Sequence, residues 1–293
     1  MQKDKISDPV IEESIKKGLI AHSKCLIAGG YSILFPGAKG VVFSLEDHFT
    51  ASIEAQTQIY PSKTYIEVYS PQFQGQAPFQ IDITRGLSEE ARFPFVEVPI
   101  LVALAYFRLK SPDAYQKVVE GVSFYRIRVL QTKGYISTKN HVVKDGADSE
   151  GGKGLGSGQI PEFGELYPLF DREISECSKT GIGSSSGIIV ILIKAVLELF
   201  GELEEDIVHF LAQIANSIVS FSNFFHFLVD FVSFLVLIFF QAQKKIGSGF
   251  DITAAVYGSS QFTRIPKDVV EDWSRRFQSL KIEDFDQESK GKN

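Results

Sequence analysis

Short apolar runs separated by turn-forming residues dominate the N-terminal part of the chain. Gly18–Ile20, Cys25–Ile27 and Gly40–Phe43 are such runs, and Gly-Gly, Pro-Gly or polar residues lie between them. This spacing predicts β-strands joined by tight turns. Thr64–Tyr69 and Tyr125–Leu130 alternate between apolar and polar side chains, which also predicts strands.

Longer apolar segments predict buried helices. Phe95–Leu109 contains few helix breakers, and Gly187–Phe200 is apolar nearly all round, with its N-terminus at a group of serines. A shorter helix is expected over Ile252–Tyr257. This mixture of strands and helices predicts an α/β (α+β) fold.

Composition limits the classes of function. With 293 residues, 44% of them hydrophobic, the chain can form one large domain or two smaller ones. A net charge of -6 gives no general attraction for nucleic acid, so no nucleic-acid partner is expected. Cys25 and Cys177 are too few for a disulfide framework and match no metal pattern. Met1–Lys17 lacks the apolar core of a secretory signal, so a cytoplasmic location is expected.

The glycine-rich and charged segment at residues 143–158 predicts a mobile loop. Gly146 and Gly151 have the separation of a P-loop, but no Lys-Ser or Lys-Thr pair follows at the required position. We therefore interpret this segment as a solvated linker.

A second glycine-rich stretch, Lys179–Gly187, runs directly into the long apolar helix. Glycines let a backbone turn closely around a phosphate, and the free amides and dipole of a helix N-terminus attract anions. The serine hydroxyls would add hydrogen bonds or a ligand for Mg²⁺. A serine N-cap after a glycine turn explains the same residues without any ligand, so both interpretations stay open.

Five motifs resemble the GHMP family of small-molecule kinases. Lys179–Gly187 is similar to the family's Gly-Leu-Gly-Ser-Ser-Ala loop, and Ser23–Leu34 to its Ala-Pro-Gly-Lys-x-Leu-x-x-Gly-Gly-Tyr motif. Pro94–Glu97 is similar to the family's Asn-Pro-Phe-Ile/Val-Glu segment. His209–Gln213 resembles a family helix, and Gln241–Ser259 resembles the Gly-Lys-x-Gly-Ser-Gly-Phe-Asp signature.

The resemblance extends over roughly residues 17–266 and is weakest over 72–176. It implies a GHMP kinase N-terminal domain with the ribosomal protein S5 domain 2-like fold. The Lys179-Thr180 pair resembles the branch that transfers the γ-phosphoryl group of ATP, with Mg²⁺, to the small molecule 5-phosphomevalonate. Such an acceptor phosphate, with a second pKa of about 6, is already ionised at neutral pH and needs cations more than a base.

Two alternatives to this activity stay open. One is another acceptor of the family, such as mevalonate, whose neutral hydroxyl would need an activating base. The other is a non-catalytic or membrane-tethered chain that binds nucleotide without transferring phosphate.

The resemblance also implies roles for individual residues. Lys24 would be the cation near the transferred phosphoryl group, and Asp251 would orient it; a surface lysine and a helix-capping aspartate are the simpler interpretations. Lys245 and Ser248 would bind the acceptor, and Ser185 would also meet Mg²⁺. The residues expected to bind ATP are Lys179, Gly181, Gly183, Ser184, Ser185 and Ser186.

Three features depart from the family pattern. Ala21–Lys24 reads Ala-His-Ser-Lys where the family has Ala-Pro-Gly-Lys. Residues 218–240 form a phenylalanine-rich insertion, long enough to span a membrane but interrupted by Asp230. A retained intron or a genuine apolar helix would explain this insertion. No counterpart of the family's C-terminal GHMP domain is expected after the last motif.

The expected organisation has three parts: an N-terminal extension over 1–17, an ATP-binding domain over 18–266 and a charged tail over 267–293. Membrane association is expected only if the insertion is a true span, and the oligomeric state stays open. His209 is expected to be a structural helix residue, because no second metal ligand lies at a suitable spacing.

Overall fold

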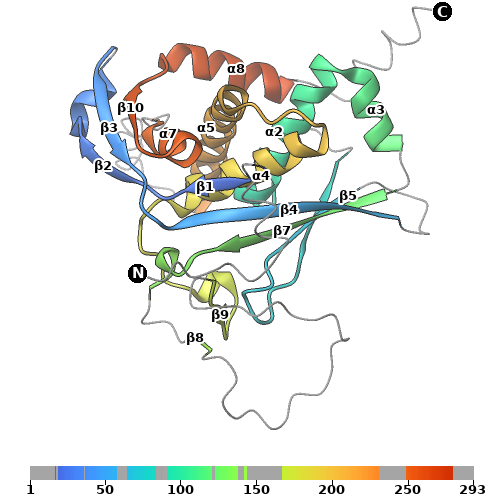
Figure 1. Ribbon diagram of the computed structural model, residues 1–293. Helices are drawn as coiled ribbons and strands as arrows, with labels where there is room; N and C mark the ends of the chain where they lie inside the picture. The colour runs from blue at the N-terminus through green and yellow to red at the C-terminus, as the bar shows by residue number, and fades with distance from the viewer. Residues whose placement is uncertain are drawn as a thin grey trace, which may run out of the picture.

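A five-stranded sheet is the base of the computed structural model, and the larger helices pack on one of its faces (Figure 1). Its strands are β1 (Ile20–His22), β4 (His48–Thr57), β5 (Tyr65–Tyr69), β6 (Phe79–Asp82) and β7 (Ser123–Gln131). Their order across the sheet is β1-β4-β7-β5-β6. Neighbouring strands are antiparallel except β5 and β7, which run parallel.

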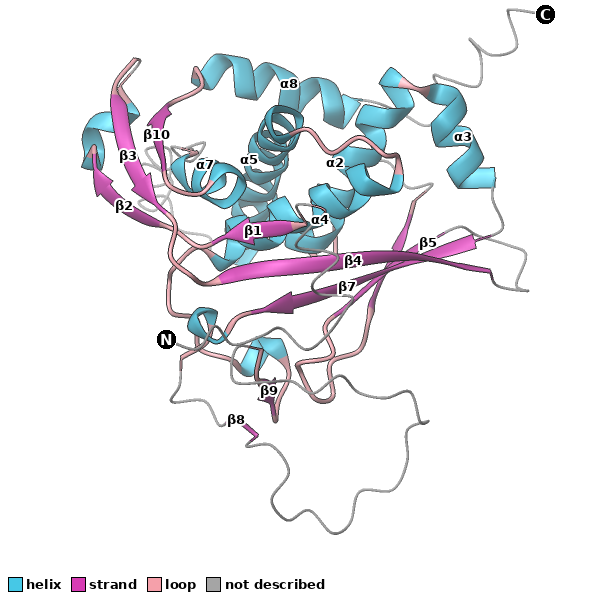
Figure 2. Cartoon of the chain, viewed as in Figure 1, coloured by secondary structure: helices cyan, strands magenta, loops and turns pink. Residues whose placement is uncertain are grey.

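Two smaller sheets accompany the central one (Figure 2). The first contains β2 (Cys25–Ala28), β3 (Lys39–Phe43) and β10 (Ser260–Thr263), and the second contains β8 (Val142–Val143) and β9 (Leu169–Phe170). In the first, β3 pairs antiparallel with both neighbours. Because β10 comes from late in the chain, this pairing brings the residues around 250 close to those around 24.

The helices supply most of the core. They are α2 (Pro94–Lys110), α3 (Pro112–Glu120), α4 (Ser184–Leu199), α5 (Glu205–Asp230), α7 (Phe250–Tyr257) and α8 (Lys267–Ser279), with short 3-10 turns η1 (Gly30–Leu34), η2 (Lys133–Tyr135) and η3 (Ile174–Glu176). Helix α4 packs against α2, α5 and β4, so it is covered on nearly every side. Even Lys194 of α4 is buried, and its Nζ donates to the carbonyl oxygen of Ile20 at 2.9 Å. Burial lowers the pKa of Lys194.

The structure describes residues 17, 19–35, 37–57, 65–83, 87, 91–120, 123–137, 142–143, 167–230 and 249–279. Most of the predicted loop over 143–158 and the second part of the insertion, 231–240, lie outside these ranges. Among the described helices, none combines the length and the hydropathy that crossing a membrane requires.

The elements predicted from hydrophobic pattern are confirmed. The predicted strands correspond to β1, β2, β3, β5 and β7, and the predicted helices to α2, α4 and α7. The long strand β4 was missed because its alternation is imperfect. Thr50, between the inward-facing Phe49 and Ala51, is itself only 2% exposed.

The start of the insertion and the start of the predicted tail both belong to the described fold. Ile218 and Val219, the first residues of the insertion, are buried in the main core as part of α5. Residues 267–279, assigned to a charged tail, instead form helix α8, with Val270 and Phe277 buried. The seven-residue separation of these two side chains places them on one helix face, and the charged residues of the other face obscured this pattern.

Candidate active site

The predicted phosphate loop ends at a left-handed glycine. Gly183 has φ of 101° and is the N-cap of α4, which begins at Ser184 as predicted. A Cβ at Gly183 would lie 2.7 Å from Cγ of Lys24. Glycine is therefore required twice, for the positive φ and for the close approach of the lysine side chain.

The rest of the loop is held by a backbone hydrogen bond at Ile182 and borders open space at Gly181. The amide of Lys24 donates to the carbonyl oxygen of Ile182 at 2.9 Å, which attaches the loop to the start of β2. Gly181 has φ of 84°, and a Cβ there would meet no atom within 4 Å. The first amides of α4 have no intrahelical acceptor, so they are available to an anion beside this open space.

The three serines at the start of α4 differ in their surroundings. Ser185 is exposed and Ser184 is half-buried. Ser186 is buried, and its hydroxyl donates to the carbonyl oxygen of Gly183 at 2.9 Å. Donation by the Ser186 hydroxyl to a phosphate would require this hydrogen bond to break.

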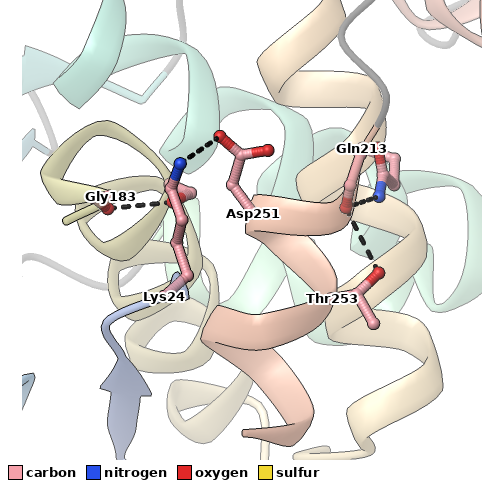
Figure 3. A network of polar contacts seen from close by, with 7 residues as sticks. Lys24, Gly183, Gln213, Asp251 and Thr253 are labelled. Carbon is pink, nitrogen blue, oxygen red and sulfur yellow. Dashed lines mark hydrogen bonds and ion pairs between the residues drawn. The ribbon is translucent and has the colours of Figure 1, made fainter. Parts of the chain in front are cut away.

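Lys24 and Asp251 form an ion pair across two elements (Figure 3). Lys24 Nζ lies 3.6 Å from Asp251 Oδ2, and the two side chains are 19% and 40% exposed. The same ammonium lies 4.8 Å from the centre of the Phe250 ring, a cation–π distance. The ring and the loop restrict the lysine to a position above the N-terminus of α4.

Asp251 lies inside α7 rather than at its cap. The N-cap is Gly249, with φ of 82°, and Asp251 belongs to the first helical turn. A carboxylate in the first turn is stabilised by the helix dipole, and here it also faces a cation. The capping interpretation of Asp251 is therefore wrong, because the helix begins one residue before it.

Asp47 stabilises the glycine-rich loop through a chain of hydrogen bonds, and this role was not predicted from the sequence. Its Oδ1 accepts hydrogen bonds from the hydroxyl of Thr132 at 2.7 Å and the amide of Gly134 at 2.9 Å. The carbonyl oxygen of Gly134 in turn accepts from the hydroxyl of Thr180 at 2.6 Å. The amide of Ser23 donates to the backbone oxygen of Asp47 at 2.9 Å. An isolated aspartate in a turn carries no sequence signal for this role.

An aromatic pair underlies these contacts. The rings of Phe49 and Tyr135 have centroids 4.4 Å apart, and a Cβ at Gly187 would lie 2.6 Å from the Phe49 ring. Burial, followed by the charge of Asp47, raises the pKa of Tyr135, so its hydroxyl remains protonated. The first turn of α4 is thus held tightly against the sheet.

A pocket of about 330 Å³ opens beside the start of α4. Ser184, Ser185 and Lys179 belong to its lining, together with Arg92 from the residues before α2. The remainder is largely apolar and aromatic: Phe49, Val68, Tyr69, Ser70, Phe73, Phe79, Phe93, Pro94, Phe95, Val96, Val129, Gln131, Ile136, Ile174 and Ile188. Its shape depends on residues from distant segments, so the sequence did not reveal it.

The structure brings most, but not all, of the predicted site residues together. Lys179 is exposed and reaches the pocket from a bridge with Ile136. Lys245 and Ser248 lie outside the described residues. Within the described ranges, no group of three His, Cys, Asp or Glu side chains is arranged to hold a metal ion. A bound Mg²⁺ would therefore need oxygen ligands from a phosphate as well as from Ser185.

The curated proteins that resemble this chain in sequence share one name. No protein-family model matches this chain. A phosphomevalonate kinase from Candida albicans is 27% identical over 267 residues, which cover 88% of this chain and 50% of the relative. A peroxisomal phosphomevalonate kinase from Arabidopsis thaliana is 24% identical over 291 residues, which cover 85% and 50%. The chain thus spans about half the length of these curated relatives.

A solved structure shares the fold. A Lin0012 protein from Listeria innocua superimposes with a TM-score of 0.53 over 90% of this chain and 52% of its own. The sequence identity is 15%, so this likeness concerns the arrangement of the elements alone. The similarity therefore extends over nearly all of the present chain.

Proposed function

We propose that this chain is a kinase of the GHMP type that phosphorylates 5-phosphomevalonate with ATP, because its sequence relatives are phosphomevalonate kinases. The reaction would give ADP and 5-diphosphomevalonate, a step of the mevalonate route to isoprenoids and sterols. The observation that carries the proposal is the Lys24–Asp251 pair at the glycine loop of α4. It combines a cation, an orienting carboxylate and free helix amides in one place.

The chemistry of the acceptor suits this arrangement. An oxygen of the acceptor phosphate would attack the γ-phosphorus of ATP, and the bond from that phosphorus to the β–γ bridging oxygen would break as ADP leaves. The attacking phosphate is already mostly ionised at neutral pH, so proton removal is a minor requirement. Lys24 would offset the negative charge of two polyanions, and Asp251 would orient the lysine rather than act as a base.

The nucleotide fits the features around α4. The base and ribose would occupy the apolar pocket, whose lining includes Ser184 and Ser185. The phosphates would lie over Gly181, where the loop borders open space, and would accept hydrogen bonds from the first amides of α4. Mg²⁺ would be held by the phosphates and Ser185, and would supply charge neutralisation.

The acceptor side is proposed from the sequence. Lys245 and Ser248 would bind the acceptor phosphate, as the resemblance implies. Lys179, exposed at the rim of the pocket, would neutralise one of the two substrates. A cytoplasmic location belongs to this proposal as well and is supported by the two free cysteines among the described residues. The Arabidopsis relative is named as peroxisomal, so targeting is worth measuring alongside activity.

A coupled ADP-release assay with 5-phosphomevalonate tests the proposal. We expect turnover by the full chain and a loss on the order of 10³-fold in Lys24→Met, because this variant keeps the length of the side chain without its charge. Mevalonate in place of 5-phosphomevalonate distinguishes the hydroxyl-acceptor alternative. Preferential turnover of mevalonate would contradict the proposed substrate.

A second candidate is nucleotide binding without transfer. It is favoured by the loop at the start of α4, because open space at Gly181 and the free first amides of the helix can bind a phosphate whether or not a phosphoryl group is transferred. Calorimetric binding of a non-hydrolysable ATP analogue, combined with the turnover assay, separates the two candidates. Binding without ADP release would support the second, and absence of both would exclude either function.

A further inference from the structure

A cluster of polar side chains joins α5 to the glycine that begins α7. His209 and Gln213 come from successive turns of α5, and Thr253 comes from the first turn of α7. Figure 3 shows Gln213 and Thr253 beside the start of α7. His209 Nε2 lies 3.0 Å from the hydroxyl of Thr253 and 3.2 Å from Nε2 of Gln213. We call His209, Gln213 and Thr253, with the carbonyl of Gly249, the α5 clamp.

The carbonyl oxygen of Gly249 is bonded more extensively than a helix start requires. It accepts the ordinary backbone bond from the amide of Thr253 at 3.1 Å. It also accepts from Nε2 of Gln213 at 3.0 Å and from the hydroxyl of Thr253 at 3.2 Å. Two side-chain donors therefore bind a carbonyl oxygen that already accepts a backbone hydrogen bond within the helix.

The approach of Gln213 is as close as the backbone permits. Gln213 is 5% exposed, and a Cβ at Gly249 would lie 2.6 Å from both Nε2 and Oε1 of its amide. Since Gly249 also has φ of 82°, only glycine combines the left-handed turn with this contact. The turn and the glutamine side chain therefore fix each other's position.

His209 Nε2 lies within hydrogen-bond distance of two groups of the clamp. A neutral ring nitrogen either donates to the Thr253 hydroxyl or accepts from an N–H of Gln213. In both cases an N–H of Gln213 donates to the carbonyl oxygen of Gly249. Burial lowers the pKa of His209 to about 4, which keeps the imidazole neutral near pH 7.

The clamp lies directly before the residues that contact Lys24. Phe250 and Asp251 follow Gly249 and meet the lysine ammonium from the ring and carboxylate sides. A rotation of the Gly249 peptide would therefore displace both groups together. Among the described residues, the hydrogen bonds of Gln213 run to His209 and Gly249, so it acts on the pair through the turn (Figure 3).

We propose that Gln213, held in place by His209, is a positioning residue that sets the carboxylate of Asp251 against Lys24 through the Gly249 carbonyl. This inference rests on the proposed kinase function for its effect on turnover. Its geometric content, the coupling of α5 to the Lys24–Asp251 pair, is independent of the substrate.

The test compares Gln213→Met with Ser217→Ala. Methionine keeps the length of the glutamine and removes both donors, whereas Ser217 is a buried α5 residue whose hydroxyl has no hydrogen-bond partner in the described part of the chain. We expect Gln213→Met to lower kcat about tenfold with unchanged affinity for the ATP analogue. Ser217→Ala should stay within about twofold of the original chain.

A double-mutant cycle distinguishes positioning from a general structural role. If Gln213 acts through Asp251, adding Gln213→Met to Asp251→Asn should lower kcat by less than about twofold. A loss of similar size in both backgrounds would overturn the proposal, because the two effects would then be independent.

A spectroscopic measurement keeps the inference testable without turnover. After reductive ¹³C-methylation, which keeps the lysine charge, the Lys24 signal is assigned by its absence in Lys24→Arg. We expect Gln213→Met to move this signal toward its position in Asp251→Asn, and Ser217→Ala to leave it unchanged. An unchanged signal in Gln213→Met would overturn the inference. Absence of turnover by the full chain with a shifted signal would instead reject the kinase function alone.

Discussion

Gly183 carries two separate structural requirements, and they can be tested apart. Its φ of 101° is unfavourable for any other residue, and a Cβ there would also lie 2.7 Å from Lys24 Cγ. Gly181 shares the first requirement, with φ of 84°, but not the second, because a Cβ would meet nothing within 4 Å. The two glycines thus form a matched pair in one loop.

We expect Gly183→Ala to lower kcat on the order of 100-fold, because the added methyl group would displace the Lys24 side chain. Gly181→Ala should lower the free energy of unfolding by about 1 kcal/mol, because alanine is strained at a positive φ, and should cause a much smaller loss of kcat. Steady-state kinetics and urea unfolding of both variants make the comparison. Equal losses of kcat would mean that backbone strain, not contact with Lys24, controls activity.

His209 gives the fold a defined acid sensitivity. Burial lowers its pKa from 6.5 to about 4, an effect partly offset by the carboxylate of Asp206, and the ring of Tyr257 packs beside it. At a pH between about 4 and 6.5, His209 binds a proton in the unfolded chain but not in the folded chain. The contribution of neutral His209 to stability is therefore full above pH 6.5 and is lost progressively as the pH falls toward 4.

The expected loss over that interval is no more than roughly 3 kcal/mol, from the difference between the two pKa values. Urea unfolding of the original chain and of His209→Gln at pH 7 and pH 4.5 measures it, because the variant removes the titration. We expect the original chain to lose more stability than the variant on acidification. Parallel losses would show that His209 is not the responsible group.

At the scale of elements, the predicted phosphate loop depends on a turn in another part of the chain. Asp47 bonds Thr132 and Gly134 beside η2, and Gly134 bonds Thr180 at the start of the loop. Thr132 is fully buried, so loss of its acceptor would leave a buried hydroxyl without its partner. The loop and η2 should therefore respond to the same substitution.

We expect Asp47→Ala to destabilise the fold by about 2 kcal/mol and to weaken binding of an ATP analogue. Glu46→Ala is the matched control, since Glu46 is exposed and contributes its backbone oxygen to His48. Urea unfolding and calorimetry measure the two effects. Destabilisation without a change in nucleotide affinity would separate the turn from the loop.

At the scale of the whole molecule, α8 closes the core over α5. Phe277 of α8 is 2% exposed, and the ring of Trp273 meets Phe210 of α5 edge to face at 5.4 Å. The structure thus makes residues 267–279 part of the folded unit, although their charge predicted a tail.

We expect Phe277→Ala to lower the free energy of unfolding by about 3–5 kcal/mol in the same cooperative transition as the rest of the domain. Arg275→Ala, on the exposed face of α8, should cost less than about 0.5 kcal/mol. Urea unfolding followed by far-UV circular dichroism gives both values. A near-zero effect of Phe277→Ala would mean that α8 contributes little to the fold.

The amino-acid sequence by itself determined the local elements and the chemistry they carry. Apolar periodicity located α2, α4 and α7, because burial on a helix or strand requires a repeat that is visible in a short window. The glycines of the loop were recognisable from their place before an apolar helix, and Lys24 and Asp251 from their places in motifs that resemble those of the GHMP kinases.

Only the tertiary structure decided how these pieces meet. The pairing of β10 with β3, the Lys24–Asp251 contact, the support from Asp47 and the α5 clamp all join residues that are distant along the chain. Such contacts depend on the packing of whole elements, for which a short stretch of sequence carries no signal. The sequence therefore identified the types of residue in the candidate site, whereas the distances between their side chains became known only from the folded structure.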